Sequence, residues 1–219
     1  MVPRVNARRP YSSPLRERQA STTRSAVLAA ARELFIAQGY GATTVEQIAQ
    51  AAGVSKPTVF SAVGNKQMVL RAVRDTAIAG DDEPVPVARR PATDRIRAEP
   101  DQHRAVQLLA RHLTDVASRY AQINEVLHAA ADGGEKDLRE LWETEEDQRL
   151  TGARFWVEVL TGKGPLRPGL SQGDAVDVMW LLMSPDNYYR LVHRRRWTRQ
   201  QYQRWLAASI TRLLFAEHP

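Results

Sequence analysis

The 219-residue sequence predicts an all-α protein, with an N-terminal three-helix domain and a larger C-terminal helical domain. Apolar residues recur at intervals of three and four over most of the chain, which is typical of one face of an α-helix. Polar N-cap residues and glycines mark the segment ends, and no segment shows the alternation of a β-strand. We expect a basic arm over 1–22, the small domain over 23–69 and the larger domain over 70–219.

Composition excludes several kinds of site. The formal net charge of +6 favours a polyanionic partner, and charge alone does not separate DNA from RNA or an anionic surface. There is no cysteine, so disulfides, thiolate zinc sites and thiol redox chemistry are excluded. No apolar run is as long as a membrane span, which needs about 20 residues. The N-terminus lacks the apolar core of a secretory signal. We therefore expect a cytoplasmic protein with no membrane partner.

The N-terminal segment changes character at Thr23. Residues 1–22 are rich in Arg, Pro and Ser and lack a sustained apolar period, so we expect a flexible arm that either follows phosphates or stays solvated. From Thr23 the apolar period is helical until Gly39 interrupts it, which predicts a first helix over about 23–38. Its apolar positions are Val27, Leu28, Ala30, Ala31, Leu34 and Phe35.

The next segment begins with two alternative helix caps. Thr44 with Gln47 fits a capping box, and Thr43 with Glu46 fits equally well. Either cap opens a short helix with Val45, Ile48 and Ala49 on one face, and Gly53 closes it, because glycine adopts the left-handed conformation that ends a helix.

Two further helices follow this turn. Ser55 can cap a helix over about 56–63, with Pro57 in its first turn, where the missing amide costs little. Gly64 ends that helix, and Asn65 can cap a fourth over about 66–79. Two short helices around a tight glycine turn form the pattern of a helix-turn-helix, whose second helix enters the major groove of DNA.

The C-terminal part is predicted as a series of longer helices. We expect a linker or loop over 80–100, with only a weak helix signal near Arg95, and a plain loop over 161–169. Gly133-Gly134 separates two helical regions. Their apolar positions are Val106, Leu109, Leu113, Val116, Tyr120 and Ile123 in the first, and Leu138, Leu141, Trp142, Phe155, Trp156, Val159 and Leu160 in the second.

Two amphipathic helices are expected at the end of the chain. The first runs over about 172–194, and Pro185 should kink or break it. The second begins at Thr198, with Gln201 in the capping-box position, and carries Tyr202, Trp205, Leu206, Ile210, Leu213 and Leu214.

Residues 23–70 resemble the DNA-binding domain of the TetR family of bacterial regulators. The resemblance rests on Ala30-Ala31, Leu34-Phe35, Gly39-Tyr40, Thr43-Thr44-Val45, Ile48-Ala49, Ala52-Gly53-Val54-Ser55, Thr58, Phe60 and Lys66. It implies a homodimer, a compact three-helix DNA-binding domain, and a helical ligand-binding and dimerisation domain. The positions at which the family contacts DNA correspond to Thr43 or Thr44, Ser55, Lys56, Pro57, Thr58, Phe60, Ser61 and Lys66.

The sequence departs from the family pattern in its second short helix. Family members usually carry Tyr at the position of Phe60 and an aromatic pair near Ala62-Val63. Phe60 has no hydroxyl to offer a phosphate, so we expect weaker positioning contacts there, with the basic arm compensating.

Several side chains of the larger domain are candidates for a ligand pocket, although each also fits ordinary core or dimer packing. They are His112, Tyr120, His128, Trp142, Phe155, Trp156 and Trp180. We expect Glu143, Glu145, Glu146 and Asp147 to form a solvated acidic helix face. No histidine has metal-ligand spacing, so no metal or cofactor is expected.

The sequence therefore predicts a ligand-responsive transcriptional repressor. It would bind a double-stranded DNA operator as a homodimer formed through about 172–215 and be released by an unidentified small molecule. The alternative is a DNA-binding regulator or architectural protein with no inducer. An enzyme is disfavoured, because no catalytic motif or cysteine nucleophile is present.

Overall fold

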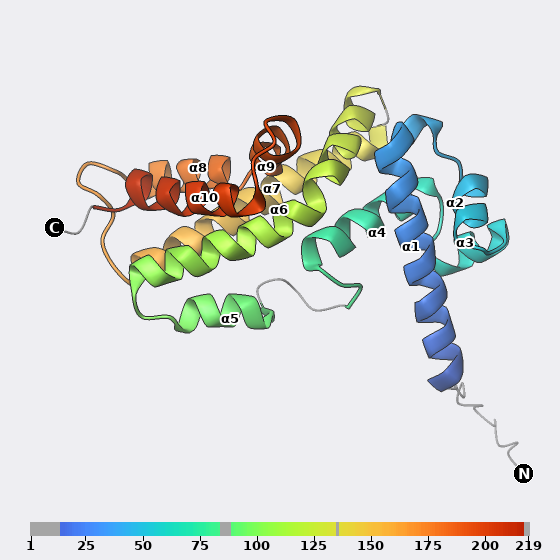
Figure 1. The fold of residues 1–219 in the computed structure, drawn as a ribbon, viewed down its shortest axis with the longest axis horizontal. Coiled ribbons are helices and arrows are strands. Elements are labelled where there is room, and N and C mark those ends of the chain that lie inside the picture. Colours follow the sequence, from blue (N-terminus) through green and yellow to red (C-terminus); the bar gives the residue numbers. More distant parts are fainter. Residues whose placement is uncertain (1–13, 84–88, 135, 217–219) are drawn as a thin grey trace, which may run out of the picture.

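The computed structural model describes residues 14–83, 89–134 and 136–216. The molecule is elongated, with the N-terminal helices at one end and the last helices of the chain at the other (Figure 1). Two long helices, α6 and α7, run between the two ends (Figure 1). No strand occurs in the described ranges, which confirms the all-α prediction there, and the one isolated β-bridge joins Leu166 to Phe215.

The N-terminal domain follows the predicted order of helices. They are α1 (Pro14–Ala42), α2 (Val45–Ala51), α3 (Lys56–Ala62) and α4 (Lys66–Ala79). The prediction that the whole segment 1–22 is an arm is wrong for residues 14–22, because α1 begins at Pro14 and continues through them. Arg16 and Arg18 therefore lie exposed on a helix. The other arm arginines, Arg4, Arg8 and Arg9, lie outside the described residues.

The apolar positions predicted from the sequence form the buried face of α1 to α4. Phe35 from α1, Ile48 from α2 and Val59 from α3 are fully buried in one cluster. Val69 and Leu70 extend this cluster along α4. Gly39 interrupts α1 with a φ of 80°, a conformation that favours glycine, so that the chain turns before α2.

The larger domain contains one helix that the sequence analysis did not assign. Its elements are α5 (Pro91–Ala98), α6 (Gln102–Asp132), α7 (Lys136–Thr161), α8 (Gln172–Leu182), α9 (Pro185–Tyr188), the π-helical segment η2 (Tyr189–Arg194) and α10 (Arg199–Leu214). The prediction of a loop over 80–100 is wrong for α5, which Pro91 opens and whose Ile96 is buried. The predicted break at Pro185 is confirmed, because α9 starts there.

Helix α6 joins the two ends of the molecule through its side chains. Its N-terminal half, with Leu109 and Ala110, belongs to the core formed with α7, α8 and α10. Its C-terminal half, with Ile123 and Leu127, belongs to the core formed with α1 and α4. Since one continuous helix contributes to both cores, the orientation of the N-terminal domain depends on how α1 and α4 pack on α6. None of the described helices is both long and apolar enough to cross a membrane.

The buried position of Ile48 gives a test of the small core. We expect Ile48→Ala to lower the free energy of unfolding by about 2–5 kcal/mol, because it leaves a cavity between α1, α2 and α3. Urea unfolding followed by circular dichroism at fixed protein concentration measures this. Gln50→Ala, an exposed change on the same helix, is the control and should stay within about 0.5 kcal/mol of the parent. Equal losses for the two variants would contradict this packing.

Candidate DNA-binding surface and ligand pocket

The cap of α2 decides which of two threonines faces solvent. The Gln47 backbone N–H donates to Thr44 Oγ1 at 3.2 Å, and the Thr44 N–H donates to Gln47 Oε1 at 2.8 Å, so Thr44 is the N-cap. Thr43 is fully buried, and its hydroxyl donates to the Gly39 carbonyl at 2.8 Å. Thr44 can therefore reach a phosphate, whereas the prediction of a DNA contact from Thr43 is wrong for this conformation.

Helix α3 presents its N-terminal side chains outward. Ser55 is its N-cap and accepts a hydrogen bond from the Thr58 backbone N–H at 3.3 Å. Gly53, with a φ of 67°, makes the tight turn before it. The predicted contact residues on this surface are exposed except Thr58, which is half-buried; they are Ser55, Lys56, Pro57, Thr58, Phe60 and Ser61. The turn and cap therefore gather them on one accessible face.

The two predicted lysines have different surroundings. Lys56 is exposed and pairs with Glu46 of α2, and the hydrogen bond from Lys56 is the main cause that lowers the pKa of Glu46. Lys66, at the start of α4, donates to the Tyr40 carbonyl at 3.0 Å and lies 4.0 Å from the centroid of the Tyr40 ring. Lys56 is thus available to a phosphate that competes with Glu46. Lys66 ties α4 to the end of α1, and a DNA contact from it stays a prediction.

The end of α3 is held by a residue that the sequence analysis missed. Arg24 of α1 donates to the Ala62 carbonyl at 3.0 Å and pairs with Asp82, beyond α4, at 2.6 Å. The side chains of Arg24 and Asp82 are each about one-third exposed. Arg24 therefore links the end of the exposed helix to the segment that leaves α4.

A cavity of about 320 Å³ lies between α4 of the N-terminal domain and α6, α7 and the start of α9 of the larger domain. Such a volume lies at the lower end of the range for small-molecule sites. Its lining residues are Arg74, Ile78, His112, Leu113, Val116, Ala117, Tyr120, Asn124, Glu145, Glu146, Gln148, Arg149, Gly152, Trp156, Met183 and Pro185. Two of them, Arg74 and Ile78, belong to α4.

A buried charged cluster joins three helices at one side of this cavity. The Arg74 guanidinium of α4 pairs with Glu145 of α7, and the Tyr120 hydroxyl of α6 donates to the same carboxylate. Arg74 also donates to Gln148 at 3.0 Å. The side chains of Arg74 and Glu145 are 9% and 7% exposed, so their charges depend on each other for compensation. Burial raises the pKa of Tyr120 and keeps its phenol protonated as a donor.

Comparison with known proteins places this arrangement in a family. The family model described as "Bacterial regulatory proteins, tetR family" matches residues 27–73. The HTH-type transcriptional regulator YdeS of Bacillus subtilis, itself described as uncharacterized, is 31% identical over 163 residues, which cover 72% of this chain and 74% of YdeS. This chain belongs to the TetR family. It is a DNA-binding transcriptional regulator and not an enzyme.

Solved structures agree with the fold over nearly the whole chain. A TetR-family regulator from Mesorhizobium loti superposes with a TM-score of 0.61 at 22% identity, covering 88% of this chain and 95% of that one. NalD, described as the secondary repressor of the MexAB-OprM multidrug efflux pump in Pseudomonas aeruginosa, gives a TM-score of 0.65 at 21% identity. That match covers 92% of this chain and all of NalD. The larger domain therefore shares the TetR-family fold.

Of the seven predicted pocket residues of this TetR-family protein, three line the cavity and four do not. His112, Tyr120 and Trp156 line the cavity, and burial lowers the pKa of His112. The other four lie outside it. His128 stacks on Trp142 with ring centroids 4.6 Å apart, Phe155 packs against Trp156 at 4.8 Å, and Trp180 lies 4.8 Å below the Arg149 guanidinium. Aromatic type alone does not distinguish the cavity wall from ordinary packing.

The two buried charged residues of the cavity wall, Arg74 and Glu145, were not predicted as pocket residues. Leu70, Arg74 and Ile78 follow one another at intervals of four on α4, so the sequence contains a charged residue within an apolar stripe. Leu141 and Glu145 repeat that signal on α7. The expectation that the whole acidic run is solvated is wrong for Glu145, which is buried, while Glu143 and Asp147 are exposed. No group of three or more metal-ligating side chains gathers among the described residues.

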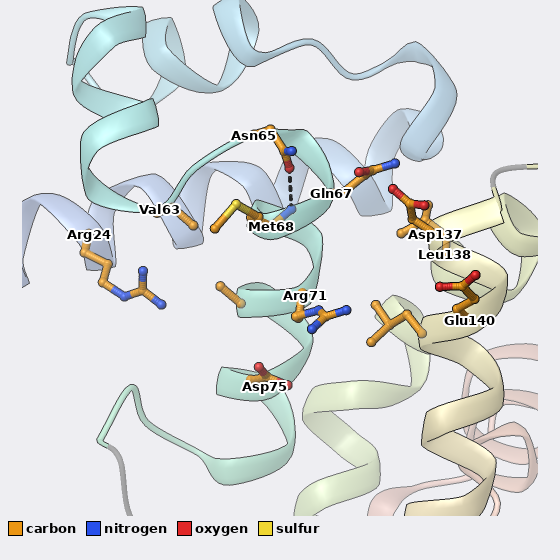
Figure 2. Close-up of a pocket in the computed structure, with 12 residues that line it drawn as sticks. Arg24, Val63, Asn65, Gln67, Met68, Arg71, Asp75, Asp137, Leu138 and Glu140 are labelled. Carbon is orange, nitrogen blue, oxygen red and sulfur yellow. Dashed lines mark hydrogen bonds between the residues drawn. The ribbon is translucent and has the colours of Figure 1, made fainter.

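A second, more open cleft separates the DNA-binding domain from the start of α7. It measures about 490 Å³, and Figure 2 shows Arg71 extending from α4 toward the side where Asp137 and Glu140 of α7 lie. Asn65 caps α4 at the upper edge and accepts from the Met68 backbone N–H at 2.9 Å (Figure 2). Because opposite walls come from the two domains, the width of this cleft follows any movement of α4 relative to α7.

The exposed ammonium of Lys56 predicts a measurable salt effect. Lys56→Gln should weaken binding to operator DNA and make the slope of log affinity against log salt shallower by about 0.9 for each lost phosphate contact. Fluorescence anisotropy with DNA fragments selected by the parent protein measures both quantities. Arg95→Gln on α5, remote from α2 and α3 in Figure 1, is the charge-matched control and should change neither. If Lys56→Gln behaves like Arg95→Gln, Lys56 does not contact phosphate.

Proposed function

We propose that this TetR-family protein is a homodimeric repressor that leaves its operator when a small molecule occupies the cavity lined by α4, α6 and α7. The observation that carries this proposal is the position of α4. Arg74 and Ile78 of α4 line the cavity, while Lys66 at its start is held by Tyr40 of the DNA-binding domain. One helix is therefore part of both sites. That NalD is described as a repressor supports the sign of regulation.

The coupling follows from the contacts of α4. A ligand that enters beside Arg74 must share or displace the interactions of that guanidinium with Glu145 and Gln148. The position of α4 against α7 then changes, and the DNA-binding domain moves with it. Two recognition helices of a dimer must lie about 34–36 Å apart to enter successive major grooves, so a modest rotation weakens operator binding. A coupling free energy of about 1–3 kcal/mol would change operator affinity about 5- to 150-fold.

The last helices supply a surface suited to dimerisation. Leu181 of α8 and Leu213 of α10 are 59% and 42% exposed, so each of these two helices presents a large apolar side chain to solvent in the single chain. Helices α8 and α10 pack against each other at the end of the molecule opposite the DNA-binding domain (Figure 1). A second copy on this surface would form the four-helix interface predicted over about 172–215 and leave both α3 helices free. Because its target is operator DNA, the dimer is proposed to act in the cytoplasm.

The cavity supports the ligand-responsive form over a regulator without an inducer. A regulator with no effector has no need of an open site lined by Trp156, Met183 and Leu113 beside a buried ion pair. The alternative predicts that no small molecule changes operator binding.

Filling the cavity tests the proposal. Leu113 lines the cavity and is half-buried, so Leu113→Trp should occupy part of the space while leaving α2 and α3 unchanged. We expect this variant to bind operator within about threefold of the parent but to respond at least tenfold less to an effector found by screening for operator release. Fluorescence anisotropy with operator DNA measures both. A full response from Leu113→Trp, or a screen in which no molecule releases the parent, would exclude this cavity as an effector site.

The dimer surface predicts a second outcome. Leu181→Arg combined with Leu213→Arg should convert the dimer to a monomer, because burying two guanidinium groups without partners is costly. Multi-angle light scattering at micromolar concentration measures the mass. Gln50→Arg, on the exposed face of α2 at the other end of the molecule, is the control and should remain dimeric. A double variant that stays dimeric would place the interface elsewhere, and a monomeric parent would exclude the dimer.

A further inference from the structure

The proposed effector cavity has two chemically different ends. The chain reverses direction between α6 and α7, so His112 lies beside Trp156, with ring centroids 6.0 Å apart, while Tyr120 lies beside Glu145. Twelve residues of α6 separate His112 from Asn124, which corresponds to about 18 Å along the helix. One end of the cavity is therefore aromatic and apolar, and the other carries the charged groups.

The charges at the polar end do not balance. Glu145 pairs with Arg74, and Glu146 pairs with Arg149. A third carboxylate, Asp186, follows the lining residue Pro185 and accepts a hydrogen bond from the lining residue Asn124 at 2.8 Å. In the described part of the chain no cationic side chain lies within ion-pair distance of Asp186. The two carboxylates and two guanidinium groups in the cavity wall thus balance, and Asp186, joined to the wall through Asn124, adds a third negative charge beside it.

The pKa of Glu146 reflects this excess of negative charge. Burial raises the pKa of Glu146, Arg149 opposes the rise, and the negative charge of Asp186 adds to it. The same carboxylate contributes, after burial, to the raised pKa of Glu125 on α6. At the other end His112 is neutral at pH 7, because burial lowers its pKa, so it does not repel a cation. A positive charge is favoured at the polar end, and an anion would have to separate Arg74 or Arg149 from its carboxylate.

We propose that the cavity takes a molecule with an apolar, preferably aromatic, body and a single cationic group. The body lies against Trp156 and Met183, and the cation lies beside Glu146 and Asn124, close to the negative charge of Asp186. This assignment rests on the proposed function only in treating the cavity as the effector site. The Trp156 ring and the thioether of Met183 offer polarizable surface to an aromatic body. Arg149 also lines the cavity, but its guanidinium pairs with Glu146 and lies 4.8 Å from the centroid of the Trp180 ring.

Three isosteric probes test this preference without DNA. They are biphenyl carboxamidine, the neutral biphenyl carboxamide and the anionic biphenyl carboxylate, titrated into the full-length protein at pH 7 by calorimetry. We expect the amidine to bind at least about tenfold more tightly than the carboxamide, and the carboxylate to bind more weakly than both. Equal affinities, a preference for the carboxylate, or no binding by any of the three would overturn the proposal.

A matched pair of variants locates the cation. Asp186→Asn removes the uncompensated charge without breaking an ion pair, so it should reduce the advantage of the amidine over the carboxamide about tenfold while leaving carboxamide affinity unchanged. Glu143→Gln neutralises an exposed carboxylate on α7 and should leave the advantage intact. An undiminished advantage in Asp186→Asn overturns the assignment. Operator release is measured separately: if the amidine binds as expected but leaves DNA binding unchanged, the effector role fails and the ligand class stands.

Discussion

The ion pair between Arg74 and Glu145 is the contact on which the arrangement of the two domains depends. It joins α4 to α7 inside the protein, and Tyr120 attaches it to α6, the helix that contributes to both cores. Two charges that are more than nine-tenths buried are stable only together, and removing one partner of such a pair typically costs about 3–5 kcal/mol. An apolar contact tolerates sliding, whereas this pair fixes the position of α4 along α7. Together with the packing of α1 and α4 on α6, that position sets the orientation of the DNA-binding domain.

The same pair explains why an occupant of the cavity is proposed to alter DNA binding. Its guanidinium and carboxylate form part of the cavity wall, so any occupant meets the group that fixes α4. At the N-terminus of α4, Lys66 donates a hydrogen bond to the Tyr40 carbonyl. Just beyond the C-terminus of α4, Asp82 forms an ion pair with Arg24, and Arg24 donates a hydrogen bond to the carbonyl at the end of α3. Both ends of α4 are thus attached to the DNA-binding domain. A shift of α4 therefore reaches α3 through short polar contacts as well as through the shared apolar core.

The sequence predicted the DNA-binding domain more completely than the cavity, for physical reasons. Caps and turns are local: Thr44 with Gln47, Gly53 and Ser55 act within a few residues of one another, so their pattern is visible in the chain. The burial of Thr43 was not visible, because it depends on the kink at Gly39. The cavity is assembled from α4, α6, α7 and the start of α9, and its buried ion pair joins Arg74 to Glu145, 71 positions further along the chain. In the sequence, Arg74 and Glu145 stand out only as charged residues within apolar stripes. That pattern does not show which residue each of them pairs with.

The Arg74–Glu145 pair is proposed to set the separation of the two DNA-binding domains in the proposed dimer. Pulsed electron paramagnetic resonance tests this most directly, because the chain has no cysteine and a single Gln50→Cys on the exposed face of α2 can carry a spin label. The distance between the two labels would be compared with and without Glu145→Met, in the absence of DNA. We predict a narrow distribution in the parent and a broadened or shifted one, by about 3 Å or more, in Glu145→Met. Superimposable distributions from two folded dimers would contradict the account.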